Sequence, residues 1–166
     1  MDAHHREHIE RCLDDHAAAE LRQYIEHVLS DEPNNVEFLE LAADCSHGVS
    51  DGEAELHFRM RAFSVAPTFG SLRKLAAVLS STARWEMAAE AWLNVARARP
   101  LDAQAFAEAG AALCQLERYR LAVNSWECAC RIQPHNEAYA NAHADALQKS
   151  GLQTAQGSNP KSRKQL

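Results

Sequence analysis

The chain has 166 residues, 46% of them hydrophobic, and a formal net charge of −6 at pH 7. This length is typical of one domain, and the hydrophobic content is enough for a folded core, which excludes a wholly disordered chain. There is no N-terminal apolar run of signal-peptide form and no stretch of about 18 apolar residues, so we expect a cytoplasmic protein without a membrane partner.

The sequence repeats with a period of 34 residues. Asn34, Thr68, Asp102 and Asn136 are spaced at this interval, and all are residue types favoured at helix N-caps. Asn34 followed by Glu37 also has the form of a capping box. Apolar residues recur at the same interval: Phe38, Leu72 and Phe106; Leu41, Leu75 and Ala109; Ala42, Ala76 and Gly110; Cys45, Leu79 and Leu113; Ala54, Ala88 and Ala122; Phe58, Trp92 and Trp126. This period predicts an all-α array of helix pairs.

Residues 1–34 are expected to form an incomplete N-terminal repeat. Its second helix has an apolar face from Leu21 to Val28, whereas its first helix keeps only Ile9 and Leu13 as apolar anchors. A terminal repeat has one face without a neighbour, so such a loss of apolar residues is expected there.

Four potential metal ligands lie four residues apart in the same segment: His4, His8, Cys12 and His16. An i, i+4 spacing can bring two side chains to one zinc ion. A straight helix spreads four such residues over about 18 Å, so at most two or three can share an ion. We therefore expect a solvated terminal helix, with no metal and no cofactor.

Residues 35–68, 69–102 and 103–136 are expected to form three complete repeats. Small residues at Ala42, Ala76 and Gly110 would let the paired helices approach to the usual 8–10 Å. The first repeat is the most irregular, because Arg61 stands where a small residue is expected and Pro67 comes one position late.

Residues 137–150 are expected to form a closing helix that covers the last repeat. The pair Ser150 and Gly151 is a plausible C-terminal helix stop. Residues 151–166 have no apolar periodicity, and we interpret them as a disordered tail.

This pattern resembles the tetratricopeptide repeat (TPR). In residues 103–136 the signature positions are held by Phe106, Ala109, Gly110, Leu113, Ala122, Trp126, Ala129 and Pro134. In residues 69–102 they are held by Leu72, Leu75, Ala76, Leu79, Ala88, Trp92, Val95 and Pro100. The resemblance implies a helix-turn-helix solenoid that binds proteins in a concave groove formed largely by the first helix of each repeat.

The resemblance also implies which residues face this groove: Val36, Leu39, Ala43, Ser46, Arg73, Lys74, Ala77, Ser80, Gln104, Ala107, Ala111, Cys114, Asn141 and Asp145. Most are small or apolar, which leaves volume for bulky side chains of a partner segment. Arg73, Gln104 and Asn141 could bond the partner's backbone or a carboxylate. Alternatively, some of these residues pack beneath neighbouring side chains.

Two TPR roles can be compared with this groove. Heat-shock co-chaperones hold a terminal carboxylate with Lys and Asn, and here the corresponding places hold Leu39, Ala43 and Lys74, which disfavours such a clamp. The short acidic chain with an apolar groove is similar to the translocator chaperones of bacterial type III secretion, which hold an unfolded partner segment until export.

Charge is distributed unevenly along the chain. Residues 1–60 carry 15 acidic and 4 basic side chains, a net charge of −11, whereas residues 61–166 carry 8 acidic and 13 basic ones, a net charge of +5. This asymmetry permits an alternative role, a structural subunit that associates through its ends and forms a homo-oligomer. It is also compatible with plain variation of the surface. Basic residues are too sparse to indicate nucleic acid binding.

Catalytic residue types occur together only at Asp44, Cys45, Ser46 and His47. Adjacent residues on a helix point in different directions, so they cannot form a nucleophile and base pair. The five scattered cysteines are expected to be reduced thiols. The sequence therefore predicts a protein that is not an enzyme, an adaptor or chaperone that binds a protein or peptide segment.

Overall fold

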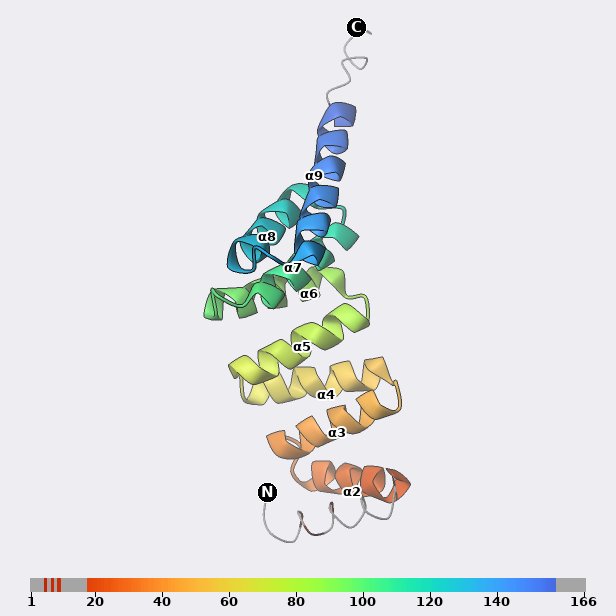
Figure 1. Cartoon of the computed structure of the whole chain (residues 1–166). Coiled ribbons are helices and arrows are strands. Elements are labelled where there is room, and N and C mark those ends of the chain that lie inside the picture. The colour runs from red at the N-terminus through yellow and green to blue at the C-terminus, as the bar shows by residue number, and fades with distance from the viewer. Residues whose placement is uncertain (1–4, 6, 8, 10–17, 158–166) are drawn as a thin grey trace, which may run out of the picture. The chain divides into compact units, whose positions relative to one another are not determined.

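The computed structural model describes His5, Glu7, Ile9 and the continuous stretch 18–157. Over these residues the regular structure is entirely α-helical, and consecutive helices are joined by short turns (Figure 1). The prediction of an all-α array of helix pairs is therefore confirmed. The chain divides into two compact units, unit 1 up to Thr82 and unit 2 from Ala83.

Unit 1 contains four described helices: α2 (Ala18–Asp31), α3 (Val36–Gly48), α4 (Gly52–Val65) and α5 (Phe69–Ser81). Each of them packs against the next. The pair α3 and α4 corresponds to the repeat predicted at 35–68.

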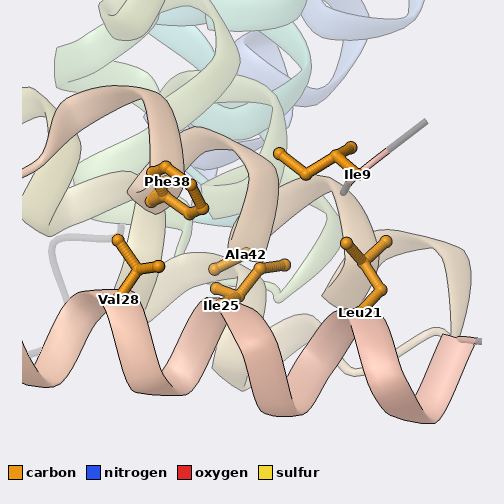
Figure 2. Close-up of a cluster of buried hydrophobic side chains, with 6 residues drawn as sticks. All are labelled: Ile9, Leu21, Ile25, Val28, Phe38 and Ala42. Carbon is orange, nitrogen blue, oxygen red and sulfur yellow. The ribbon is translucent and has the colours of Figure 1, made fainter. Parts of the chain in front are cut away.

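The predicted apolar face of the N-terminal segment is buried. Leu21, Ile25 and Val28 project from α2 toward Phe38 and Ala42 of α3 (Figure 2). The described Ile9 belongs to the same buried cluster: its side chain is only 6% exposed.

The predicted ladder of metal ligands, His4, His8, Cys12 and His16, lies outside the described residues, as does Leu13. His5 is described, and its Nδ1 lies 2.6 Å from the hydroxyl oxygen of Tyr24. Within the described part of the chain, no group of three or more His, Cys, Asp or Glu side chains is placed to hold a metal ion.

Unit 2 contains α6 (Trp85–Ala98), α7 (Ala103–Gln115), α8 (Tyr119–Ile132) and α9 (Glu137–Gly157), again with each helix packed against the next. The predicted end of the closing helix at Ser150 is wrong, because α9 continues through Gly151. A single glycine inside a helix costs only about 1 kcal/mol relative to alanine. Gly151 also lacks the positive φ of a left-handed helix cap.

Three of the four predicted N-caps are confirmed. Thr68 accepts a hydrogen bond from the backbone N–H of Ser71 at 3.1 Å, within a reciprocal capping box. Asp102 accepts from the N–H of Ala105 at 3.1 Å, and Asn136 from that of Tyr139 at 3.3 Å. Each side-chain oxygen thus satisfies a backbone donor that the first helical turn leaves without a partner.

The predicted cap at Asn34, and with it the capping box, is wrong. The cap of α3 is Asn35, whose side chain accepts from the N–H of Phe38 at 3.3 Å. Asn35 follows Pro33 by two residues, the same spacing by which Asp102 follows Pro100. The cap of α3 therefore keeps this spacing from the proline and lies one residue after the position that the repeat period gives.

The second helix of the first repeat buries a different face from α6 and α8. Phe58 is only half-buried, whereas Trp92 and Trp126 at the same repeat position are 3% and 9% exposed. The fully buried small residue of α4 is Ala62, one position after Arg61. Pro67 also comes one position later than the corresponding prolines of the next repeats, so the proline and the buried face of α4 are shifted by the same single residue.

The helices α7 and α8 approach closely at Gly110. A Cβ atom on this glycine would lie 2.8 Å from Nε1 and 2.9 Å from Cε2 of the Trp126 indole ring. Real Cβ atoms do not occupy such positions, so the absence of a side chain here permits the contact.

We expect Gly110→Ala to lower the free energy of unfolding by about 1–3 kcal/mol, because the added methyl group displaces the indole ring from a packed core. Urea denaturation followed by circular dichroism measures this loss. Gly48→Ala is the matched control, since nothing lies within 4 Å of a Cβ at Gly48. Equal stability of Gly110→Ala and the wild type would show that the close contact does not constrain the fold.

Candidate functional site

In each unit a cleft lies beside a predicted groove helix. The unit 1 cleft, of about 360 Å³, is lined by His47, Glu55, Arg59, Lys74, Ala77, Val78 and Ser81. The unit 2 cleft, of about 410 Å³, is lined by Gln104, Ala107, Glu108, Ala111, Trp126, Gln133 and Tyr139. Both volumes lie in the range of ligand pockets in proteins.

A buried guanidinium group organises the unit 1 cleft. The Arg59 side chain is 6% exposed, and its Nη1 donates to Oε2 of Glu40 at 2.5 Å while its Nη2 donates to Oδ1 of Asp44 at 2.6 Å. Oε1 of Glu55 lies 3.6 Å from Nη2. The Nε atom of Arg59 is buried and has no hydrogen-bond partner among the described atoms.

Lys74 and His47 of this cleft join the same network. Nζ of Lys74 donates to Oε2 of Glu40 at 2.5 Å, and Nδ1 of His47 lies 2.9 Å from Oε2 of Glu55. Both cations of the unit 1 cleft, Arg59 and Lys74, thus already have carboxylate partners inside unit 1. For Arg59, which is buried, this pairing makes the charge tolerable in the interior.

The unit 2 cleft combines aromatic and small side chains. The rings of Trp126 and Tyr139 have centroids 6.0 Å apart and planes inclined at 47°. Ala107 and Ala111 of α7 contribute only methyl groups to the lining. Nε1 of Trp126 is buried without a hydrogen-bond partner among the described atoms. With Gln104, Glu108 and Gln133 also in the lining, the cleft offers apolar and polar surface around an open volume.

A larger hollow of about 640 Å³ adjoins the unit 2 cleft at the turn between α6 and α7. Gln104 and Gln133 line both, and the larger hollow extends to Pro100 and Leu101. Leu101 is 84% exposed. An extended segment lying in the cleft would therefore have further apolar surface at one end.

The two clefts include five of the residues predicted to face the groove. Lys74 and Ala77 line the cleft of unit 1, and Gln104, Ala107 and Ala111 line that of unit 2. All five lie on α5 or α7, which are first helices of their repeats.

The remaining predicted groove residues lie outside both clefts. Leu39, Ala43 and Ser46 are buried, and the Ser46 hydroxyl donates to the carbonyl oxygen of Ala42 at 2.9 Å. Half-buried positions are Val36, Arg73, Ser80 and Cys114, while Asn141 and Asp145 are exposed on α9. Leu39, Ala43 and Ser46 thus pack beneath neighbouring groups, the alternative that the sequence left open.

The sequence prediction missed the cleft residues that do not lie on the expected face of a first helix. Arg59 and Trp126 reach their clefts from second helices, and Gln133 comes from the turn after α8. Glu108 lies one residue beyond Ala107. A period-34 comparison could have identified Glu108, because it is the repeat equivalent of Lys74.

Of the residues that could suggest catalysis, Cys45 is half-buried, and Ser46 and His47 have hydrogen-bond partners. Burial raises the pKa of the Cys45 thiol above its usual value, with a smaller contribution from the Asp44 carboxylate, while Arg22 lowers it. A raised pKa leaves less of the reactive thiolate at neutral pH. The hydroxyl of Ser46 and the ring of His47 have the partners described above.

No family model and no curated protein matches the chain. Solved structures of MamA, a TPR protein, do match it. MamA AMB-1 has a TM-score of 0.74 at 17% identity, over 89% of this chain and 81% of that one. MamA MSR-1 gives 0.72 at 18% identity, over 89% and 85%. MamA 41-end from Desulfovibrio magneticus RS-1 gives 0.67 at 18%, over 93% and 95%. The chain therefore has a TPR fold.

A test for a membrane span is also negative for the described helices. None of them has the length and apolar character needed to cross a bilayer.

We expect Arg59→Ala to lower the free energy of unfolding by about 3 kcal/mol, because it leaves the carboxylates of Glu55 and Glu40 in the interior with one cation fewer. The double variant Glu55→Val/Arg59→Leu is the control. It installs the residues found at the equivalent positions Val123 and Leu93, and we expect it to recover most of the loss. Urea denaturation of the three proteins at pH 7 measures both effects. If Arg59→Ala has the same free energy of unfolding as the wild type, the ion network adds nothing to the stability of the fold.

Proposed function

We propose that this chain is a non-catalytic protein-interaction module, an adaptor or chaperone that holds a segment of a partner protein in the clefts beside its first helices. The observation that carries this proposal is the unit 2 cleft. There the methyl groups of Ala107 and Ala111 leave an open volume of about 410 Å³ beside the rings of Trp126 and Tyr139. Such a surface takes a bulky side chain of a partner, packed through its apolar part.

The energetics favour an extended partner segment over a single side chain. A partner side chain that buries about 100 Å² of apolar surface gains roughly 2.5 kcal/mol. Micromolar affinity requires about 8 kcal/mol after the entropic cost of association. Several anchors are therefore needed, and the hollow beside Leu101 offers a further one next to the unit 2 cleft.

An adaptor and a chaperone differ in the state of the partner. In the chaperone role, the clefts bind a partner segment that stays unfolded until export, as the similarity to type III translocator chaperones implies. That similarity rests on the size of the chain and the small residues of its groove. The adaptor role requires only that the segment be exposed in a folded partner.

The residues at the clamp positions of unit 1 argue against a carboxylate clamp as the mode of binding. Leu39 and Ala43, at two of the clamp positions, are completely buried. Lys74, at the third, is already paired with Glu40. Capture of apolar side chains is thus favoured over capture of a terminal carboxylate.

We expect the double variant Ala77→Trp/Ala111→Trp to lose the partner, because indole rings would fill both clefts. Affinity capture from the cytosol of the source cell, with mass spectrometry of the retained proteins, compares this variant with the wild type. Ala98→Trp serves as the control, since Ala98 is exposed on α6 and lines neither cleft. Circular dichroism establishes that all three proteins are equally helical. If all three proteins retain the partner equally, the partner does not bind in the clefts.

The charge asymmetry between residues 1–60 and 61–166 favours a second candidate, a structural subunit that assembles through its ends. Complementary charges mainly set encounter rate and register, and salt screens them. This candidate predicts an oligomer that dissociates in about 0.5 M salt and is unaffected by Ala77→Trp/Ala111→Trp. Light scattering coupled to gel filtration at low and high salt measures it. A monomer under both conditions would exclude assembly of this kind.

A further inference from the structure

The unit 2 cleft contains a carboxylate that no described side chain neutralises. Glu108 is half-buried on α7 and lines the cleft. It forms no ion pair or hydrogen bond with another side chain in the described stretch 18–157. A carboxylate partly withdrawn from water gains from a cation within hydrogen-bonding distance.

The equivalent position in unit 1 shows the contrast. Lys74 stands 34 residues before Glu108, and its ammonium group is neutralised by Glu40 at 2.5 Å. Arg59, the other cation of that cleft, is likewise paired. Of the two clefts, only that of unit 2 presents a charge without a partner among the described residues.

The side chains around Glu108 suit a long cation with a hydrocarbon stem. The rings of Trp126 and Tyr139, with centroids 6.0 Å apart, supply aromatic surface against which a stem or a planar cation can pack. Because Ala107 and Ala111 are short, they leave the cleft open along α7. The amide oxygen of Gln133, which accepts a hydrogen bond from Nδ2 of Asn136 at 3.3 Å, has a second lone pair and is a further acceptor in the lining.

We infer that the unit 2 cleft binds an arginine side chain of the partner segment, with its guanidinium group on the Glu108 carboxylate and its stem against Trp126 and Tyr139. This inference rests on the proposed function and names the chemistry of the partner. Arginine is favoured over lysine because its planar group can stack on an aromatic ring and donate two hydrogen bonds to one carboxylate.

The test uses short blocked peptides that are identical except for a central arginine, lysine or glutamine. The full chain is labelled with ¹⁵N, and the indole N–H signal of Trp126, assigned by Trp126→Phe, is followed during titration. We expect the arginine peptide to bind about tenfold more tightly than the glutamine peptide. Lysine should lie between them.

The variant Glu108→Gln should remove this preference and leave the affinity for the glutamine peptide within about twofold. The control Glu127→Gln changes the net charge equally at an exposed position outside the cleft and should preserve the preference. Equal affinities of all three peptides for the wild type, unchanged by Glu108→Gln, would overturn recognition of a cation while leaving groove capture in place.

Two further outcomes would also overturn the inference. If no peptide shifts the Trp126 signal, the unit 2 cleft is not the arginine site, and capture of the partner by Ala111→Trp alone then tells whether groove binding fails as well. If removal of residues 158–166 shifts the Trp126 signal before any peptide is added, the basic tail with Lys161, Arg163 and Lys164 is the occupant in place of a partner.

Discussion

The contact between Gly110 and the indole ring of Trp126 sets how closely α7 and α8 can pack in unit 2. Because Gly110 has no side chain, the ring lies against the α7 backbone and also lines the cleft beside Ala107 and Ala111. One residue of the core is therefore a residue of the candidate site. The packing that stabilises the helix pair also holds the aromatic surface in place, so a ligand meets a preformed cleft and loses little entropy in ordering it.

At the corresponding positions, unit 1 has buried charged residues where unit 2 has apolar packing. The one-residue shift in the buried face of α4 brings Glu55 and Arg59 into the interior, where α6 has Ala89 and Leu93. A buried ion network adds little net stability over apolar packing of similar volume, but loss of one member is costly. The charges of the unit 1 cleft are accordingly tied to the fold, which leaves them less available to a ligand than the carboxylate of Glu108.

The fold was largely predictable because the repeat period and the helical period are both encoded in apolar residues. The helix caps Thr68 and Asp102 follow from residue type and spacing, since a cap is a local interaction. The prediction was wrong at two helix ends, the start of α3 and the end of α9. Asn35 caps α3 one residue later than the repeat period gives, and α9 passes Gly151 because one glycine is a weak stop without a positive φ.

The site was less predictable, because a cleft is a property of several elements together. Small residues such as Ala77 and Ala111 could be placed on groove helices from the repeat period alone. Trp126, in contrast, reaches its cleft from a second helix, and the sequence does not show how that helix is rotated about its axis. The exchange of Lys74 for Glu108 between successive repeats shows why this matters. Both positions lie at the rim of a cleft, where a change of charge leaves the core intact. The same scaffold can therefore present opposite charges in successive repeats, and in the proposed function the charge at this position selects the partner side chain that each cleft accepts.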